Sequence, residues 1–292
     1  MFKIKLAHKI KKGTGRQKML KIAVFSDIHI GRRKLIIYQY DRLFNFNDKE
    51  AVVGKEIERR LEMAVRQINK QKFDFTVIAG DITESGDRDQ FLRAAEILNN
   101  LERPLVPLMG NHDLWPFSRN ENGQIIWQAE RQKNVCEFES YFNDGWKDIV
   151  KNFSSQGNSF QNYVFTFEGV RFIVVDNLNR RHAFWGFPGT SAFPKLHQKS
   201  REWLREQLIS IQEEKIIIFS HAVIDVNLLK RLTKMTKTSV TNVCGHSHKS
   251  SSKENENIRV LKLPAFYLSS KILEIELGKQ RICFFMNQIS SS

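Results

Sequence analysis

Residues 105–113 read Leu-Val-Pro-Leu-Met-Gly-Asn-His-Asp, an apolar run that ends in the polar side chains of Asn111, His112 and Asp113. The run has the length of a strand, and Gly110 at its end lets the backbone turn sharply. Four other apolar runs end in the same way, with Asp27-Ile28-His29, Gly80-Asp81, Ser220-His221 and Gly245-His246-Ser247-His248. The sequence therefore predicts that oxygen and nitrogen ligands gather where strands end.

The elements around these segments alternate between strand and helix. In the first half of the chain we expect strands over 20–25, 73–79 and 105–109 and helices over 55–70 and 88–99. Apolar side chains at the helical period indicate the first helix, at Ile57, Leu61, Ala64, Val65 and Ile68. This alternation indicates an α/β domain, in which sites lie at the carboxyl ends of strands.

The second half of the chain is richer in strands. We expect a hairpin over 162–168 and 170–176, a helix over 195–213, and strands over 216–219, 240–244, 258–263, 265–268, 272–277 and 282–285. Residues at about 114–160 break the rhythm, and we interpret them as an irregular, partly helical insertion, either a cap over the substrate or a structural annex. Residues 20–292 are interpreted as one domain, preceded by a basic extension over 1–19 that we expect to be flexible.

The charge of the chain is unevenly distributed. The net charge is +14 over 292 residues, and residues 1–20 hold seven lysine or arginine residues with no acid. Such an arm could bind nucleic acid or an acidic membrane surface. The alternative interpretations are a solvated tail, or residues upstream of a natural start at Met19.

Composition narrows the class of protein. The chain is 41% hydrophobic, which is ample for a large core, but no apolar run is long enough to span a bilayer. The basic N-terminus lacks the apolar stretch of a secretory signal. The three cysteines, Cys136, Cys244 and Cys283, are widely spaced, which favours free thiols in a reducing compartment, and we expect a cytoplasmic protein.

The candidate ligands suit a pair of divalent cations. All of them are Asp, Asn or His, a set that favours Mn, Fe or Zn. Spacing by two residues places Asp27 and His29 on one face of an extended chain, and likewise His246 and His248. Asp81 has two carboxylate oxygens to divide between neighbouring cations, and water held between two cations is deprotonated near neutral pH. The pattern therefore predicts attack by water on a phosphate ester.

The segment over 110–113 also offers a proton donor. A leaving alkoxide needs a proton, and His112 is placed to give it or to stabilise charge in the transition state. We expect Asp113 to fix the tautomer of His112. Arg32 and Arg33, just after the first segment, are interpreted as solvated, with a phosphate contact as the alternative.

The remaining histidines, His8, His182 and His197, are expected at the surface, although His182 is a candidate for contact with substrate. Cys244 is interpreted as strand packing, and Trp115 and Trp185 as wall or core residues.

Together, the five segments resemble those of the calcineurin-like metallophosphoesterase superfamily, D-x-H, GD, GNH[DE], H and GH-x-H, from about residue 20 to residue 248. The resemblance implies a four-layer α-β-β-α sandwich with two mixed β-sheets. It implies that one metal is held by Asp27, His29, Asp81 and His248, and the other by Asp81, Asn111, His221 and His246. It also implies that His112 is the catalytic histidine and Asp113 its partner.

Within that superfamily the middle of the chain is similar to the class III cyclic-nucleotide phosphodiesterase branch, through residues 163–176, a glycine-bearing loop and Trp203-Leu204. Residues 82–87, Ile-Thr-Glu-Ser-Gly-Asp, depart from the usual short aliphatic and acidic pattern. The sequence Gly-Asn-His-Asp, and not Gly-Asn-Arg-Asp, argues against the lipid A pathway hydrolases.

The expected function is a two-metal phosphodiesterase or phosphatase acting on a phosphorylated small molecule or nucleotide. A nuclease of the DNA-repair metallophosphoesterase type is an alternative that would use the basic arm, although such enzymes usually carry a DNA-binding cap after this domain. A non-catalytic scaffold on the same fold, as in the retromer subunit, is a further alternative, although that variant typically loses ligands. The sequence makes no prediction of the oligomeric state.

Overall fold

In the computed structural model the described residues are 19–32, 54–114, 117–119, 125–127, 131–142, 152–156, 159–167, 170–178, 196–209, 215–234, 238–278 and 282–289. Apart from Met19, the basic extension lies outside them, as do His182, Arg33, Trp115 and Trp185. Within the described ranges, no helix is long and apolar enough to cross a membrane.

The first sheet carries the first three candidate segments. It has five strands in the order β14-β13-β1-β2-β3. Their bounds are β1 Leu20–Phe25, β2 Phe75–Ala79, β3 Leu105–Leu108, β13 Lys271–Leu277 and β14 Ile282–Gln288. Strands β1, β2 and β3 are parallel, whereas β13 is antiparallel to β1, so the sheet is mixed.

The second sheet carries the other two segments. It has seven strands in the order β11-β12-β10-β9-β8-β7-β6. Their bounds are β6 Asn152–Gln156, β7 Ser159–Phe167, β8 Val170–Val175, β9 Lys215–Ser220, β10 Ser239–Cys244, β11 Ser251–Asn255 and β12 Ile258–Lys262. The central strands β8, β9, β10 and β12 are parallel, and the outer pairs are antiparallel.

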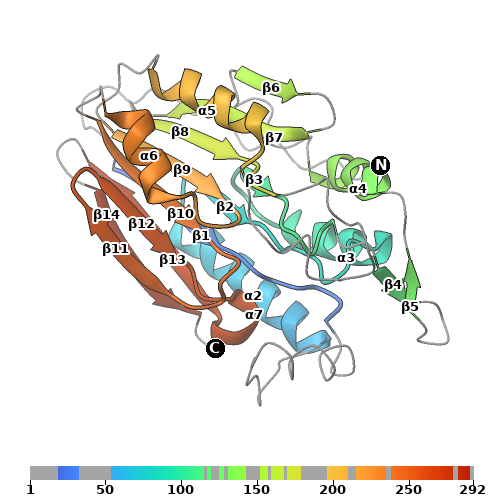
Figure 1. The fold of residues 1–292 in the computed structure, drawn as a ribbon. Helices are drawn as coiled ribbons and strands as arrows, with labels where there is room; N and C mark the ends of the chain where they lie inside the picture. Colours follow the sequence, from blue (N-terminus) through green and yellow to red (C-terminus); the bar gives the residue numbers. More distant parts are fainter. Residues whose placement is uncertain are drawn as a thin grey trace.

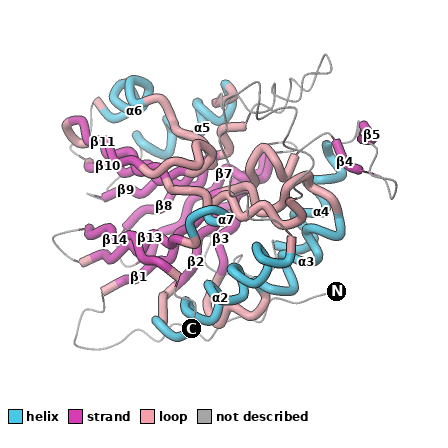
Figure 2. The backbone as a smooth tube through the Cα atoms, turned by 90° about the horizontal axis from the view of Figure 1, so that it is seen from below, coloured by secondary structure: helices cyan, strands magenta, loops and turns pink. Residues whose placement is uncertain are grey.

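The two sheets pack face to face, and helices cover both outer faces (Figure 2). Helices α2 (Lys55–Gln71), α3 (Arg88–Leu98), α4 (Arg131–Phe142) and α7 (Phe266–Ser269) lie on the first sheet, and α5 (Gln198–Ile209) and α6 (Val226–Thr233) lie on the second. The expected four-layer α-β-β-α sandwich with two mixed sheets is therefore confirmed.

Alternation along the central strands builds three cores. In β1, Ile22 and Val24 face the second sheet, whereas Ala23 and Phe25 pack under the helices. Strand β9 repeats this pattern, with alternate residues in the core between the sheets and in the core under α5 and α6. Burial on both faces explains why these strands read as continuous apolar runs in the sequence.

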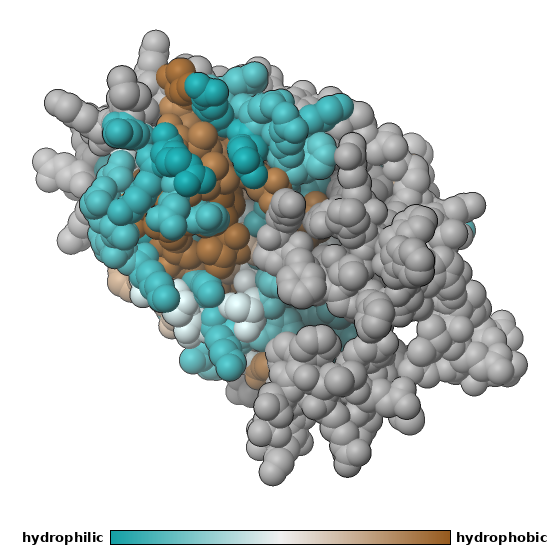
Figure 3. Space-filling view, viewed as in Figure 1, coloured by the Kyte–Doolittle hydropathy of each residue, from teal (hydrophilic) through white to brown (hydrophobic). Residues whose placement is uncertain are grey.

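Seen from the side of Figure 1, the described surface is largely hydrophilic around a band of hydrophobic side chains (Figure 3). Large exposed hydrophobic residues in the described part of the chain include Ile209, at the end of α5, and Phe285 and Met286 on the edge strand β14.

The predicted strand over 265–268 is wrong. These residues form the helical turn α7, closed by a hydrogen bond of 2.8 Å from the amide of Ser270 to the carbonyl of Phe266. The turn docks on the loop after β1, since the amide of Phe266 donates to the carbonyl of Ser26. Four apolar residues alone do not distinguish a strand from a helical turn.

The structure describes part of the stretch over 114–160, which we interpreted as an irregular, partly helical insertion. It holds a short hairpin of β4 (Phe117–Arg119) and β5 (Ile125–Trp127), then α4, and then the edge strand β6. Strand β11 and helix α6 were not predicted. All five residues of β11 are exposed, so it lacks the apolar pattern of a buried strand.

Parallel strands bring the candidate segments to one edge of the molecule. β1, β2 and β3 are neighbours in one sheet, β9 and β10 are neighbours in the other, and each ends in a candidate segment (Figure 1). The loops after these strands therefore meet.

Candidate metal centre

The loops after β1 and β2 run side by side. The amide of Asp27 donates to the carbonyl of Gly80 at 3.0 Å, and the amide of Ile28 donates to that of Asp81 at 2.8 Å. Farther on, the amide of Ile30 donates to the carbonyl of Ile82 at 3.0 Å. This ladder fixes the first two candidate segments against each other.

Several candidate ligands have left-handed backbone conformations. The φ angles are 56° at Asp27, 58° at His29, 52° at Asp81, 65° at His246 and 56° at His248. Positive φ is uncommon for residues other than glycine, and such strain persists only where surrounding contacts enforce it. The local backbone is thus bent to aim side chains from several loops at one place.

Glycines let these loops approach closely. A Cβ at Gly110 would collide with the carboxylate and the amide of Asp81, and a Cβ at Gly80 would collide with the ring of His221. A Cβ at Gly245 would meet Ser26 and the carboxylate of Asp27. The absence of a side chain at these three positions is therefore a requirement of the packing around the site.

A first group of four side chains converges at the edge of the first sheet. One ligand atom from each of Asp27, His29, Asp81 and His248 lies within 4.8 Å of the others. Nε2 of His248 is 3.4 Å from Oδ1 of Asp27, and Nε2 of His29 is 3.7 Å from Oδ2 of Asp81. A cation at the centre of this group would have oxygen and nitrogen donors on several sides.

A second group lies against the first and shares Asp81. Ligand atoms of Asp81, His221 and His246 also lie within 4.8 Å of one another. Oδ1 of Asn111 is 2.9 Å from Nε2 of His221 and 2.9 Å from Nδ1 of His246. The structure thus brings together all seven residues predicted as ligands, in the two sets that the resemblance implies. Their ligation itself stays a prediction.

His29 offers a test of whether a cation fits. Its Nδ1 lies 2.7 Å from Oε2 of Glu84, while its Nε2 is buried and has no hydrogen-bond partner in the described part of the chain. A buried nitrogen without a partner is costly, and a divalent cation would satisfy it. The donor set of carboxylates, one amide and imidazoles also suits Mn, Fe or Zn.

The charges of the site favour ligation at some of these residues and oppose it at His221. Burial lowers the pKa of His29 to about 4 and that of His246 to about 4, so both rings are neutral at pH 7. Burial alone would raise the pKa of Asp81, but nearby His221 and His112 hold it well below its usual range. Burial would lower the pKa of His221, but the charge of Asp81 raises it to about 9, so a cation must compete with that proton.

His112 lies beside the first group, with its ring edge-on to that of His29, and its Nδ1 has a backbone partner. Nδ1 of His112 lies 2.8 Å from the backbone carbonyl oxygen of Glu84. This contact fixes the tautomer of His112, a role that we expected Asp113 to have. Both carboxylate oxygens of Asp113 accept hydrogen bonds from the loop backbone, including the amides of Thr83 and Gly110 at 2.8 Å. These hydrogen bonds tie the loop after β3 to the loop after β2, and the partnership of Asp113 with His112 stays a prediction.

Two further residues around the site were not recognised from the sequence, and a third, Arg32, was considered only as an alternative contact to phosphate. Glu84 was noted only as part of a departure from the family pattern, and Tyr267 lay in the wrongly predicted strand. Arg32 is buried instead of solvated, and its guanidinium lies 4.3 Å above the ring of Tyr267. The sequence offered one signal for these residues, which is that the acidic residue Glu84 lies three positions after Asp81.

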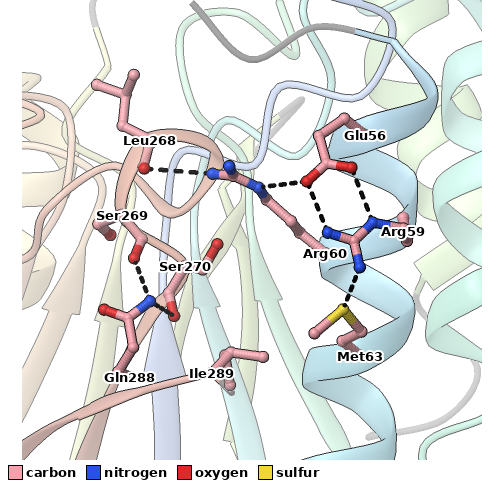
Figure 4. Close-up of a pocket in the computed structure, with 9 residues that line it drawn as sticks. All are labelled: Glu56, Arg59, Arg60, Met63, Leu268, Ser269, Ser270, Gln288 and Ile289. Carbon is pink, nitrogen blue, oxygen red and sulfur yellow. Dashed lines mark hydrogen bonds and ion pairs between the residues drawn. The ribbon is translucent and has the colours of Figure 1, made fainter. Parts of the chain in front are cut away.

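Tyr267 is held in place from the side of α2. Arg60 donates hydrogen bonds to the carbonyls of Tyr267 and Leu268, at 2.8 and 3.2 Å. Arg60 and Leu268 line a cavity of about 200 Å³, where the bond between them is visible (Figure 4). The ring of Tyr267 packs edge-on against His29 and His248, with centroids 5.1 and 5.6 Å apart.

Neither His197 nor Cys244 belongs to these converging groups of ligand atoms. His197 precedes α5, where its Nδ1 accepts a hydrogen bond from the amide of Lys199. Cys244 is buried in β10, and burial raises the pKa of its thiol to about 12, which suits packing and not ligation.

The sequence profile named calcineurin-like phosphoesterase matches residues 20–250 of this chain. A probable cyclic nucleotide phosphodiesterase of Xenorhabdus bovienii is 27% identical over 161 residues, which cover 54% of this chain and 54% of that protein. A probable glycerophosphodiester phosphodiesterase of Arcobacter nitrofigilis is 24% identical over 189 residues, which cover 64% of this chain and 56% of that protein. The chain thus spans about half the length of these curated relatives.

Solved structures share the fold at low identity. A dimetal phosphatase from Danio rerio superposes with a TM-score of 0.59 and 13% identity, covering 93% of this chain and 96% of that one. Purple acid phosphatase PPD1 from yellow lupin seeds superposes with a TM-score of 0.56 and 11% identity, covering 94% of this chain and 52% of that one.

Proposed function

The chain belongs to the calcineurin-like phosphoesterase family, and on that premise we propose that it hydrolyses phosphate esters with two divalent cations. The proposed ligands are Asp27, His29, Asp81 and His248 for one cation, and Asp81, Asn111, His221 and His246 for the other. We propose Mn, Fe or Zn as the cations, and the cytoplasm as the compartment.

One observation carries the proposal. The carboxylate of Asp81 belongs to both groups of converging ligand atoms: its Oδ2 is 3.7 Å from Nε2 of His29 and 3.2 Å from Nε2 of His221. A shared carboxylate between two imidazole-rich groups supports a dinuclear centre, in which two cations lie about 3.5–4 Å apart.

The protein's own residues would then have different roles in the reaction. When bound, the cations supply Lewis acidity and lower the pKa of water toward neutrality. Asp81 and Asp27 provide negative charge that keeps the cations in place. His112 holds its Nδ1–H against the carbonyl of Glu84. When Nε2 is protonated as well, the ring is an imidazolium, and it can give the Nε2 proton to the leaving oxygen and become neutral.

A phosphodiester of a small molecule or nucleotide is the proposed substrate. Two curated relatives carry names of phosphodiesterases, one for cyclic nucleotides and one for glycerophosphodiesters. Within the described residues no feature favours DNA, because the basic arm lies outside them.

The test compares esters and variants. Protein loaded with Mn²⁺ is assayed with bis-p-nitrophenyl phosphate, p-nitrophenyl phosphate, a cyclic nucleotide, a glycerophosphodiester and linear DNA. We expect diester cleavage that falls by about 100-fold or more in Asp81→Asn, and by about 10²–10⁴-fold in His112→Ala. Equal rates in the wild type and both variants would refute the proposal, and DNA as the preferred substrate would favour a nuclease.

A further inference from the structure

Glu84 contacts both histidines that flank the proposed reaction centre. Oε2 of its carboxylate lies 2.7 Å from Nδ1 of His29, and its backbone carbonyl lies 2.8 Å from Nδ1 of His112. The residue is 6% exposed and lies three positions after Asp81. One buried residue thus meets two imidazoles through two different groups.

We propose that Glu84 is a positioning residue that aims the proposed cation ligand His29 and the proposed proton donor His112 at the same centre. The inference rests on the proposed function, because it assigns these two roles. It goes further because the relative placement of the proposed ligand His29 and the proposed proton donor His112 would depend on one residue that is not among the proposed ligands.

The geometry of the two rings supports this proposal. A carbonyl oxygen only accepts hydrogen bonds, so Nδ1 of His112 carries a proton and its Nε2 is left for chemistry. The carboxylate of Glu84 likewise occupies Nδ1 of His29, and Nε2 of His29 is buried and has no hydrogen-bond partner in the described part of the chain. The two rings meet edge to face, with centroids 4.6 Å apart. Moving one ring would therefore displace the other.

Glu84 is itself held firmly. Its amide donates to the carbonyl of Ile30 at 2.9 Å and to Oε1 of Gln90 at 3.1 Å. Nη1 of Arg32 lies 3.6 Å from the same Oε2 that faces His29, and the guanidinium of Arg32 stacks on Tyr267. The carboxylate of Glu84 is thus placed by its own backbone and by the buried guanidinium of Arg32, which is held in turn by the ring of Tyr267.

A carboxylate does more for an imidazole ligand than a carbonyl does. His221, in the second group, pairs its Nδ1 with the backbone carbonyl of Ala79 at 2.9 Å. His29 has an anion in the corresponding place, which orients the ring and makes it a stronger donor to a metal. The negative charge beside His29 is therefore a specific feature of the first group.

The experiment measures cation affinity directly. Metal-stripped wild type, Glu84→Ala and Glu84→Gln are titrated with Co²⁺ and followed by visible absorption, which reports the geometry of the ligands. We expect Glu84→Ala to lose about 10- to 100-fold in affinity, with a changed spectrum. Glu84→Gln keeps an oxygen that can accept from Nδ1 of His29, so it should recover part of the loss.

A matched control separates orientation from the stability of the loop. Ser85 is next in the chain, and its side chain bonds to Asp87 and Gln90 within the same loop. Ser85→Ala should keep the Co²⁺ affinity and spectrum of the wild type. An equal loss in Ser85→Ala and Glu84→Ala, or no loss in Glu84→Ala, would overturn the inference.

The kinetic readout distinguishes this inference from the proposed function. At saturating Co²⁺, Glu84→Ala should retain the KM for a diester and lose kcat, because the ring against which His112 packs is no longer held. If the wild type binds no Co²⁺ or cleaves no ester, the proposed function fails. If the wild type does both and Glu84→Ala matches it in affinity, spectrum and kcat, only the role of Glu84 is refuted.

Discussion

Arg60 on α2 donates a hydrogen bond of 2.8 Å to the backbone carbonyl of Tyr267, whose ring packs against His29 and His248. A helix on the outer face of the first sheet is thereby tied to two of the proposed ligands. The link runs through the turn α7, which the sequence did not reveal.

Arg60→Met should destabilise the protein more than Arg59→Met. Both side chains bond to Glu56, but only Arg60 reaches the carbonyls of α7 (Figure 4). Arg60 is 23% exposed and Arg59 is 52% exposed. Losing a hydrogen bond from a charged group should cost Arg60→Met about 1–2 kcal/mol in the free energy of unfolding. Urea unfolding of the two variants measures the difference in the free energy of unfolding. Equal midpoints would show that the hydrogen bonds from Arg60 to α7 do not stabilise the protein.

Glu56→Gln should show a stability deficit that depends on pH. Hydrogen bonds from Arg59 and then Arg60 lower the pKa of Glu56 to about 2. A lowered carboxyl pKa contributes stability above about pH 4.5, and this contribution is lost as the pH falls toward 2. The effect is small because the pair is largely exposed. Urea unfolding at pH 7 and pH 3 should show a smaller gap between wild type and variant at pH 3, and a gap that widens there would contradict the assignment.

Gly110→Ala should impair cation binding through a steric effect. The added Cβ would collide with the carboxylate and backbone of Asp81, so the shared carboxylate must move. We expect at least about a 10-fold loss of Mn²⁺ affinity, measured by calorimetry.

The control is Gly54→Ala, where φ is 57° but no atom lies within 4 Å of the added Cβ. It should lose stability through its backbone conformation while keeping the affinity for Mn²⁺. An equal loss of affinity in the two variants would mean that replacing glycine, and not the collision with Asp81, is responsible.

The two proposed cation sites should be separable by mutation. His248 belongs to the first group and His221 to the second, while Asp81 belongs to both. Metal analysis after dialysis should therefore show about two ions per wild-type chain, and about one in His248→Ala or His221→Ala. Asp81→Ala should retain the least metal, and full occupancy in that variant would argue against a shared carboxylate.

Cation binding should also stabilise the fold. A ligand at 100 times its Kd contributes about 2.7 kcal/mol to stability. Thermal unfolding with Mn²⁺ should thus occur at a higher temperature than after treatment with EDTA, and the difference should shrink in His29→Ala. An EDTA-insensitive Tm would contradict cation binding to the folded state.

The sequence predicted the layout of the site well because its proposed ligands follow buried strands. β1, β2, β3, β9 and β10 are buried on both faces, so the motif after each strand was easy to locate. Parallel pairing then explains why Asp27 and Asn111, distant in the chain, lie in one place.

The supporting residues could not be predicted in the same way. Tyr267 reaches the site from a helical turn that carries no periodic pattern, and Arg32 is buried only because that turn places an aromatic ring beneath it. The sequence also carried no sign that the carboxylate of Asp113 accepts hydrogen bonds from the distant amides of Ile82 and Thr83. Such contacts depend on how loops meet in space, and local sequence does not encode that meeting.

The left-handed backbone also limits which substitutions can be accepted during evolution at five positions, Asp27, His29, Asp81, His246 and His248. If the proposed hydrolysis were no longer selected, glycine or asparagine at these positions would relieve strain, whereas β-branched residues would add to it. Descendants that have lost the activity should therefore carry Gly or Asn there more often than Val, Ile or Thr, and the decay of the enzyme would leave a more stable protein behind.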